Sequence, residues 1–137
     1  MLLRQADVNE VVAATGQTTE TAIQESIDAA LSSYVMIHEG KVEGVFGITD
    51  GGGFGSPWML ATNNLHAFRR EFLAESRCIV SGWSEEHYVL FNHVDSRHTE
   101  ALHWLSWLGF HIHTDCPITL CDPSVPFFPF TMYRSLS

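Results

Sequence analysis

The chain has 137 residues, of which 45% are hydrophobic, and a formal net charge of −9 at pH 7. This length and composition predict a single compact domain, spanning residues 1–137, with its own hydrophobic core. Its seven basic residues are scattered, which excludes a protein that binds nucleic-acid phosphates through clustered Lys and Arg. No apolar run is long enough to span a membrane, and the N-terminal residues lack the hydrophobic stretch of a signal peptide.

The first thirty residues predict two short helices. Asp7 is in position to cap a helix that runs through Ala14 and ends at Gly16. Thr18 or Thr19 starts the second helix. Apolar residues recur at helical spacing in this second segment, and we expect them to form one buried stripe: Ile23, Ile27, Ala30 and Leu31.

A hairpin and a third strand follow. Strands are predicted at residues 34–38 and 42–48, on either side of Glu39-Gly40-Lys41, and at residues 57–62. The glycine-rich run at residues 50–56 precedes a strand, and no Lys-Ser or Lys-Thr pair follows it. We therefore interpret this run as a mobile connection rather than a phosphate-binding loop.

The next segment predicts a long helix and another strand. Asn63 or Asn64 is expected to cap a helix from Leu65 to about Trp83. Apolar residues at helical spacing mark its buried face: Leu65, Phe68, Phe72, Ile79 and Trp83. The strand is predicted at residues 87–94.

Residues 94–110, which read VDSRHTEALHWLSWLGF, predict a second long amphipathic helix. Asp95 or Ser96 is expected to cap it. Its broad apolar face predicts that Trp104 and Leu108 are buried. Further strands are predicted after it, at residues 111–113 and 128–133.

Gly109 stands where a helix ends in a left-handed residue, and Phe110 opens a new strand. This unit of strand, helix, Leu-Gly-Phe and strand resembles the C-terminal signature of the GNAT superfamily of acyl-CoA-dependent N-acetyltransferases. The resemblance implies an α/β (α+β) fold, a single domain in which helices flank a mixed β-sheet on both faces. The predicted element order, α-α-β-β-β-α-β-α-β-β, is close to the GNAT arrangement. The resemblance also implies acetyl-CoA as cofactor and an amine as acceptor substrate.

Further motifs extend over most of the chain. They are SPWMLAT at residues 56–62, the helical residues Arg69, Phe72, Ser76 and Arg77, NHVD at residues 92–95, WLSWLGF at residues 104–110 and PFFPF at residues 126–130. Together they resemble a small family of GNAT-like proteins of tailed phages. In short-tailed phages this family includes an internal virion protein. The resemblance implies a place in the host-cell cytoplasm or the virion, with virion or host proteins as partners.

The GNAT resemblance implies that the pyrophosphate of acetyl-CoA lies at the start of the helix near Asn64, where helix N–H groups attract an anion. The backbone of the strand that contains Leu60 would polarise the thioester carbonyl. The full set of residues implied to bind the cofactor is Leu60, Thr62, Asn64, Leu65, His66, Arg69 and His98.

Three departures from the GNAT pattern fall in this region. Residues 62–68 read TNNLHAF and contain no glycine that would let the backbone approach a phosphate closely. Leu105 stands at the position of the usual tyrosine acid, and His98 stands at that of the usual asparagine. We therefore expect binding of acetyl-CoA to be weak or absent.

His93 and Asp95 are the candidate catalytic residues. His93 lies on the strand beside the cleft that the resemblance implies, and a neutral imidazole can accept an amine proton near pH 7. Water is an alternative base, and Asp50 and Glu39 are weaker candidates because loop carboxylates are usually solvated. Two functions remain open: a phage acetyltransferase, and a non-catalytic virion or host-interaction protein that keeps the GNAT fold. For the second function, Trp107 falls off the apolar stripe of its helix and is a candidate contact residue.

The remaining pattern is His111, His113, Cys116 and Cys121. The two histidines alternate along a strand and share one face, so that a tetrahedral zinc site is one interpretation. The spacing matches no common zinc knuckle, and we expect ordinary cysteines and no metal site. With Cys78 the cysteines are odd in number, which favours a reducing compartment over a disulfide framework.

Overall fold

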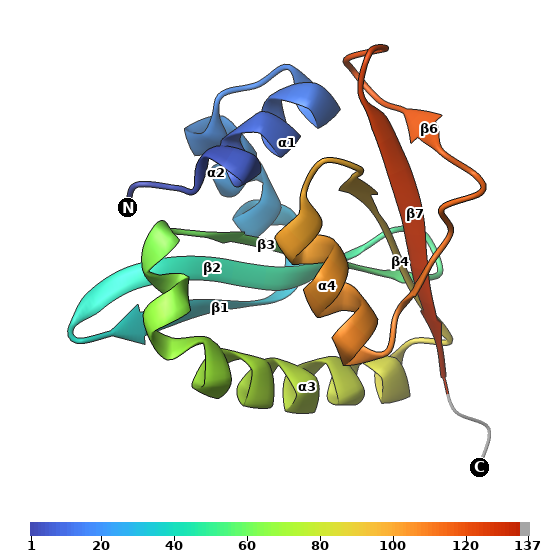
Figure 1. Ribbon diagram of the computed structural model, residues 1–137. Coiled ribbons are helices and arrows are strands. Elements are labelled where there is room, and N and C mark those ends of the chain that lie inside the picture. The colour runs from blue at the N-terminus through green and yellow to red at the C-terminus, as the bar shows by residue number, and fades with distance from the viewer. Residues whose placement is uncertain (135–137) are drawn as a thin grey trace.

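The computed structural model describes residues 1–134. The protein consists of a mixed β-sheet with helices on both faces (Figure 1). The helical elements are α1 (Gln5–Thr15), α2 (Thr19–Ala29), the 3-10 helix η1 (Asn63–Phe68), α3 (Arg69–Glu86) and α4 (Thr99–Leu108). The strands are β1 (Ala30–His38), β2 (Lys41–Asp50), β3 (Gly55–Ala61), β4 (Val89–Asp95), β5 (His111–Ile112), β6 (Ile118–Thr119) and β7 (Pro126–Tyr133). The seven strands form one sheet in the order β1-β2-β3-β4-β7-β5, with β6 paired to β7. The predicted α/β fold is confirmed, whereas the short strand β6 is an addition to it.

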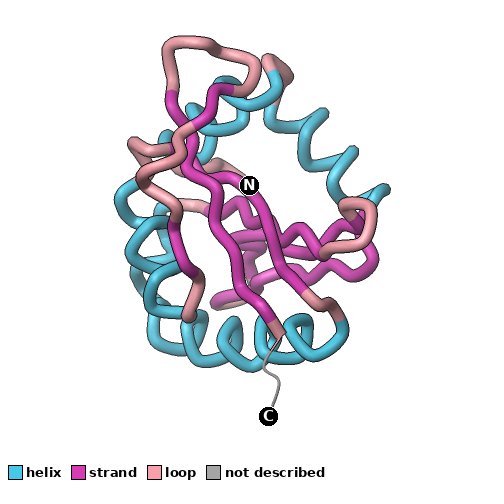
Figure 2. Tube along the Cα trace, turned by 90° about the vertical axis from the view of Figure 1, so that its right-hand side faces the viewer, coloured by secondary structure: helices cyan, strands magenta, loops and turns pink. Residues whose placement is uncertain are grey.

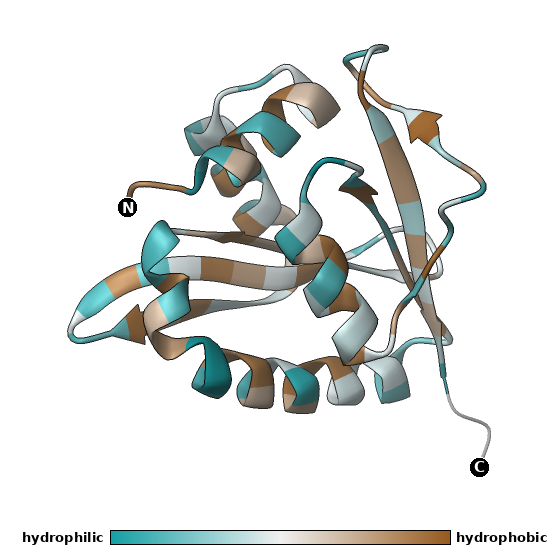
Figure 3. Ribbon diagram, in the orientation of Figure 1, coloured by the Kyte–Doolittle hydropathy of each residue, from teal (hydrophilic) through white to brown (hydrophobic). Residues whose placement is uncertain are grey.

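The helices bury apolar residues on both faces of the sheet (Figures 1 and 2). On one face α3 and α4 cover a core formed by Ile48, Val80, Trp83, Leu90, Val94, Phe110 and Phe130. On the other face α1 and α2 cover a smaller core formed by Val11, Val45 and Leu60. Hydrophobic and hydrophilic residues alternate along α3 in Figure 3, as expected for a helix with one buried face. Among the described residues, no helix is long and apolar enough to cross a membrane.

The hairpin predicted around Glu39-Gly40 is confirmed, with β1 and β2 paired antiparallel on either side of it. The buried stripe predicted for the second helix is wrong. The helix ends at Ala29, so that Ala30 and Leu31 already belong to β1. Ile27 and Leu31 are 40% and 58% exposed, whereas Ile23 is partly buried and packs against the core of Val11, Val45 and Leu60.

The start of the long helix also differs from the prediction. Thr62, and not Asn63 or Asn64, is the cap: its hydroxyl accepts the N–H of Asn64 at 3.2 Å. The first turns form η1, and regular α-helix begins only at Arg69. Two of the predicted buried residues, Leu65 and Phe68, therefore belong to η1, and both are buried.

The following helix, α4, begins later than predicted. Its cap is His98, whose ring nitrogen faces the N–H of Ala101 at 3.4 Å, and neither Asp95 nor Ser96 caps it. Gly109 ends the helix with φ of 105°, which confirms the predicted left-handed residue. Trp104 is buried as predicted, and Leu108 is only partly buried.

One contact in the middle of the sheet positions the candidate site. The parallel strands β3 and β4 meet at the register pair Gly55 and Leu90, and then diverge. Gly55 eases this approach, because a Cβ there would lie 2.6 Å from Cδ1 of Ile48 and 3.0 Å from Cδ2 of Leu90, and both side chains would have to shift. Beyond this pair the two strands leave a wedge-shaped opening, which we call the split.

Candidate functional site

Backbone groups of β3 face the split. In the antiparallel β2–β3 ladder, Ala61 turns both its N–H and its C=O away from β2 and toward α1 and the segment before it. Because the orientation alternates along a strand, Met59 and Pro57 turn their backbone groups to the same side. The Met59 N–H and C=O therefore face the middle of the split.

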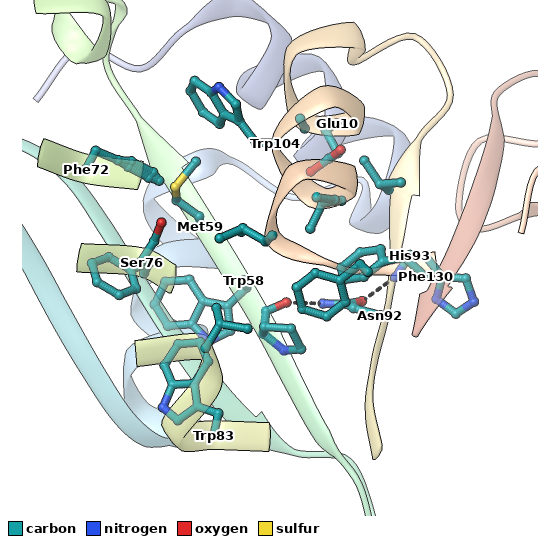
Figure 4. Close-up of a pocket in the computed structure, with 18 residues that line it drawn as sticks. Glu10, Trp58, Met59, Phe72, Ser76, Trp83, Asn92, His93, Trp104 and Phe130 are labelled. Atoms are coloured by element: carbon teal, nitrogen blue, oxygen red, sulfur yellow. Dashed lines mark hydrogen bonds between the residues drawn. The ribbon is translucent and has the colours of Figure 1, made fainter. Parts of the chain in front are cut away.

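Asn92 of β4 bridges the narrow end of the split (Figure 4). Its Nδ2 donates to the Pro57 carbonyl at 2.8 Å, and its Oδ1 accepts the N–H of His93 at 2.8 Å. One side-chain amide thus takes the place of the main-chain hydrogen bonds that two paired strands would make. The bridge fixes the point from which β3 and β4 separate.

Two carboxylates of α1 close the wide end of the split. Asp7 accepts the N–H of Ala61 from β3 at 2.8 Å. Glu10 accepts the N–H of Asp95 from β4 at 2.9 Å. The helix is thereby tied to both diverging strands through hydrogen bonds to carboxylates, which are stronger than neutral ones.

A buried ionic cluster holds α1 in this place. Asp7 forms a two-pronged pair with Arg4 at 3.0 Å and meets Nε2 of His98 at 2.7 Å. Arg4 also donates to Glu100 of α4 at 2.8 Å. Burial opposes ionisation of Asp7, but hydrogen bonds from His98 and Arg4 outweigh it and lower the pKa of the carboxyl. These contacts link α1, β3 and α4 into one unit.

A cavity of about 160 Å³ lies between the split and the helices α3 and α4 (Figure 4). Its walls are mainly apolar and include Met59, Phe72, Trp83, Trp104 and Leu105, with the Glu10 carboxylate at one end. Such a space is smaller than the roughly 300–1,000 Å³ typical of whole-ligand pockets. It is large enough for a small reacting group and too small for an entire cofactor.

Glu10 is the titratable group of this cavity that the sequence does not reveal. Burial raises its pKa to about 7, nearby Asp7 and Asp95 act in the same direction, and the Asp95 N–H and His98 oppose them. A carboxylate with this pKa can accept or release a proton near neutral pH. The available signal was the spacing of Asp7 and Glu10, which places both on one face of a helix.

His93 lies on β4 as predicted, but its ring is directed away from the cavity in Figure 4. The ring packs edge-on against Phe91 at 4.9 Å. Burial lowers the pKa of His93, which keeps the imidazole neutral at pH 7. Glu10 and His93 both line the cavity, but the His93 ring is directed out of it (Figure 4).

The carboxylate of Asp95 is occupied by another contact. Asp95 is only 1% exposed and pairs with Arg97 at 2.6 Å. Burial opposes its ionisation, but the hydrogen bonds from Arg97 prevail and lower the pKa of Asp95. Asp95 contributes its backbone N–H to the split, while its side chain closes the turn before α4.

The residues expected to bind the cofactor do not form one surface. Leu60, Thr62, Leu65 and His98 are buried, whereas Asn64, His66 and Arg69 are exposed. The N–H groups of Asn64 and Leu65 already bond to the side chain and the carbonyl of Thr62. His66 lies 3.5 Å from Glu100, a carboxylate that would repel a phosphate. At the start of η1, these contacts leave the N–H groups of Asn64 and Leu65 less available to a pyrophosphate.

The histidines and cysteines near the C-terminus, for which a zinc site was one interpretation, make other contacts in the structure. The rings of His111 and His113 pack edge-on at 4.4 Å, and His113 contacts the Thr131 hydroxyl at 2.9 Å. Cys116 and Cys121 are exposed free thiols. Within residues 1–134, no group of three or more His, Cys, Asp or Glu side chains is arranged to hold a metal ion.

Comparisons with known proteins show which fold the chain has. No family model and no curated protein sequence matches the chain. Among solved structures, the IAA acetyltransferase from Bacillus cereus is 16% identical, with a TM-score of 0.61 over 91% of this chain and 90% of that one. The ribosomal-protein-S18-alanine N-acetyltransferase from Escherichia coli is 12% identical, with a TM-score of 0.61 over 97% and 88%. A GNAT family acetyltransferase from Elizabethkingia anophelis, solved with acetyl-CoA bound, is 12% identical, with a TM-score of 0.61 over 91% and 88%. At these identities the similarity concerns the fold: this chain has the fold of the GNAT-family N-acetyltransferases.

Proposed function

We propose that the protein is an N-acyltransferase that transfers an acetyl group from acetyl-CoA to an amine. The observation that carries the proposal is the cavity beside the split, which joins the backbone of β3 to a carboxylate whose pKa is about 7. The fold supports the same activity by analogy. Acetyl-CoA supplies the acetyl group as an activated thioester.

In this proposal Glu10 is the general base. Its carboxylate would hold the proton that the attacking amine loses, and a pKa near the working pH suits that task. The Met59 N–H, which faces the split, is placed to donate to a carbonyl oxygen that gains negative charge. His93, which is neutral and also lines the cavity, is the alternative base.

The missing parts of the site make slow transfer the expectation. Leu105 lines the cavity and has no proton to give to a leaving thiolate. The start of η1 has few free donors for a phosphate group, because the N–H groups of Asn64 and Leu65 already bond to Thr62. We therefore expect binding of acetyl-CoA to be weak, with the acetyl end contributing most of the contacts.

These same features favour a second candidate function, a non-catalytic protein that keeps the GNAT fold. Asp7 and Glu10 occupy the free N–H groups of Ala61 and Asp95, so that α1 itself fills the wide end of the split. The motif resemblance to phage proteins supports a role in the virion or in contact with host proteins, in the host-cell cytoplasm or the particle. In that role the protein would bind its partner through its surface, including the half-exposed Trp107, and the cavity would have no function.

Calorimetry with acetyl-CoA, followed by a thiol-release assay on a panel of amines, distinguishes the two functions. For the acyltransferase we expect binding, turnover, and a loss of turnover by about 10²-fold or more in Glu10→Gln with little change in binding. Glu85→Gln, at an exposed position of α3, is the matched control and should keep the wild-type rate. No binding at millimolar acetyl-CoA and no thiol release would leave the non-catalytic function. Turnover at the wild-type rate in Glu10→Gln would remove Glu10 from the mechanism.

A further inference from the structure

β1 is an unprotected edge of the sheet. It stands at the end of the strand order, so that β2 pairs with one side of it and no strand of the described chain pairs with the other (Figure 1). Edge strands of monomers are usually short or carry charges or proline that prevent pairing with another chain. β1 is nine residues long and reads ALSSYVMIH, with neither a charged residue nor a proline.

Apolar side chains surround this edge. Val35 and Ile37 alternate along β1 and share one face, and they are 55% and 67% exposed. Leu31, at the register irregularity between Ala30 and Ser32, is 58% exposed. Val42 of β2, the register partner of Ile37, is 44% exposed beside them. We call these four residues the β1 patch. Isolated exposed apolar residues are ordinary, but a contiguous group along an open strand edge is typical of an interface.

The distribution of charge favours β1 as the surface at which two copies of the chain meet. With a net charge of −9, two copies of the protein repel each other over most of their surfaces. The β1 segment contributes none of this charge. It is a surface at which two copies can approach with little electrostatic cost and with main-chain hydrogen bonds to gain.

We propose that the protein forms a homodimer in which β1 pairs antiparallel with β1 of a second copy, with Tyr34 on the two-fold axis. Irregularities in the β1–β2 register lie between Ala30 and Ser32 and between Met36 and Ile37, which leaves Ser32–Met36 as a regular run centred on Tyr34. Antiparallel pairing about this centre is self-complementary, as a two-fold interface requires. It sets Ser32 opposite the partner subunit's Met36 and Val35 opposite the partner subunit's Ser33. The two sheets then join into one.

Sedimentation equilibrium on the wild-type chain and on matched lysine variants tests the dimer. The wild type is expected at twice the 15.4 kDa mass of one chain. Val35→Lys adds a charge to the edge and is expected to give monomers, with an unchanged circular dichroism spectrum because the side chain is already 55% exposed. Val12→Lys makes the same change at a 52% exposed position of α1 and should remain dimeric.

Ser33→Lys, at the neighbouring exposed position, is a second test in case Val35→Lys folds poorly. Amide hydrogen exchange adds a local readout: the outward-facing amides of β1 are expected to lose protection on dilution of the wild type and in the monomeric variant. A wild-type chain that remains monomeric at its highest soluble concentration overturns the proposal. So does a dimer that survives both β1 variants, since it must use another surface. None of these readouts depends on acyl transfer.

Discussion

Asp7 and Glu10 lie one turn apart on α1, and each binds the backbone of a different strand of the split. Asp7 takes the Ala61 N–H of β3 at 2.8 Å, and Glu10 takes the Asp95 N–H of β4 at 2.9 Å. The two carboxylates have opposite electrostatic surroundings. Asp7 is paired with Arg4 and has a lowered pKa, while Glu10 forms no ion pair within residues 1–134 and has a raised pKa. One anchor of α1 is therefore permanently charged at neutral pH, and the other changes its charge there.

The first prediction concerns the charged anchor. Asp7→Asn removes the two-pronged carboxylate partner of Arg4, a guanidinium that is 4% exposed, and leaves it only the contact with Glu100. We expect a loss of about 3–5 kcal/mol in the free energy of unfolding, measured by urea denaturation, because the buried Arg4 loses one of its two carboxylates and His98 loses the same group. Asp28→Asn removes an exposed carboxylate that contacts only Gln24 at 2.8 Å, and it should cost less than about 0.5 kcal/mol. Equal losses in the two variants would contradict a structural role for the buried cluster.

The second prediction concerns the pH dependence that Glu10 creates. Its folded pKa of about 7 lies above the usual 4.5, so the folded state binds the extra proton. The resulting stability is fully present below pH 4.5 and is lost as the pH rises through 7. Between about pH 5 and 8 we expect this carboxyl to cost the wild type roughly 1–3 kcal/mol of unfolding free energy.

His93 opposes this trend, since its lowered pKa makes the fold less stable as the pH falls through 6.5. The informative quantity is therefore the difference between the wild type and Glu10→Gln, measured by thermal or urea unfolding at several pH values. His93 is common to both proteins and cancels. The difference should shift in favour of Glu10→Gln as the pH rises. A difference that is flat between about pH 5 and 8 would show that Glu10 titrates as an ordinary surface carboxyl.

The fold was predictable where local chemistry decides the structure. Gly109 ends α4 because glycine adopts the left-handed conformation of a helix end without cost. The helical spacing of the apolar residues around Trp104 identifies the buried side of α4. The starts of helices depend on more distant contacts. Thr62 caps η1 ahead of two asparagines because its hydroxyl is also held by Glu43 of β2 at 2.8 Å. Asp95 does not cap α4 because Arg97 occupies its carboxylate.

The candidate site was less predictable, because its contacts join segments that are far apart in the chain. Glu10 and Asp95 are 85 positions apart, and Asp7 and His98 are 91 apart. A carboxylate in a short first helix has the sequence pattern of a solvated residue, and nothing nearby shows that its helix faces two strand ends. His93 was correctly assigned to a strand. Which face of the sheet its ring lies on follows from the alternation of β4 together with the packing of α3 and α4, which cover Leu90 and Val94.

A third prediction compares Gly109, whose backbone conformation favours glycine, with Gly82, whose conformation does not. Gly109 has φ of 105°, so Gly109→Val should lower the unfolding free energy by about 2 kcal/mol or more, because a β-branched residue resists this backbone. Gly82 lies inside α3, and a Cβ there would meet nothing within 4 Å. Gly82→Ala should therefore raise the unfolding free energy by about 0.5–1 kcal/mol. Chemical denaturation of both variants tests the pair, and a stabilising Gly109→Val would contradict the helix end described here.

The last prediction uses two tryptophans of α4 to test the cavity. Trp104 is 8% exposed, packs edge-on against Phe72 at 5.2 Å and lines the cavity, whereas Trp107 is 44% exposed and stacks with Arg77 at 4.0 Å. Trp104→Ala should cost about 3–5 kcal/mol of unfolding free energy, as large core truncations do. Trp107→Ala should cost about 1 kcal/mol or less.

The same pair separates loss of packing from a general effect of removing an indole. Trp104→Ala enlarges an apolar cavity, and enlarged apolar cavities bind small aromatic molecules. Free indole is therefore expected to raise the melting temperature of Trp104→Ala in a concentration-dependent way and to leave Trp107→Ala unchanged. Stabilisation of both variants would mean that indole binds elsewhere. Stabilisation of neither would mean that α3 and α4 close over the space, and that the walls of the proposed acetyl site are not rigid enough to keep it open.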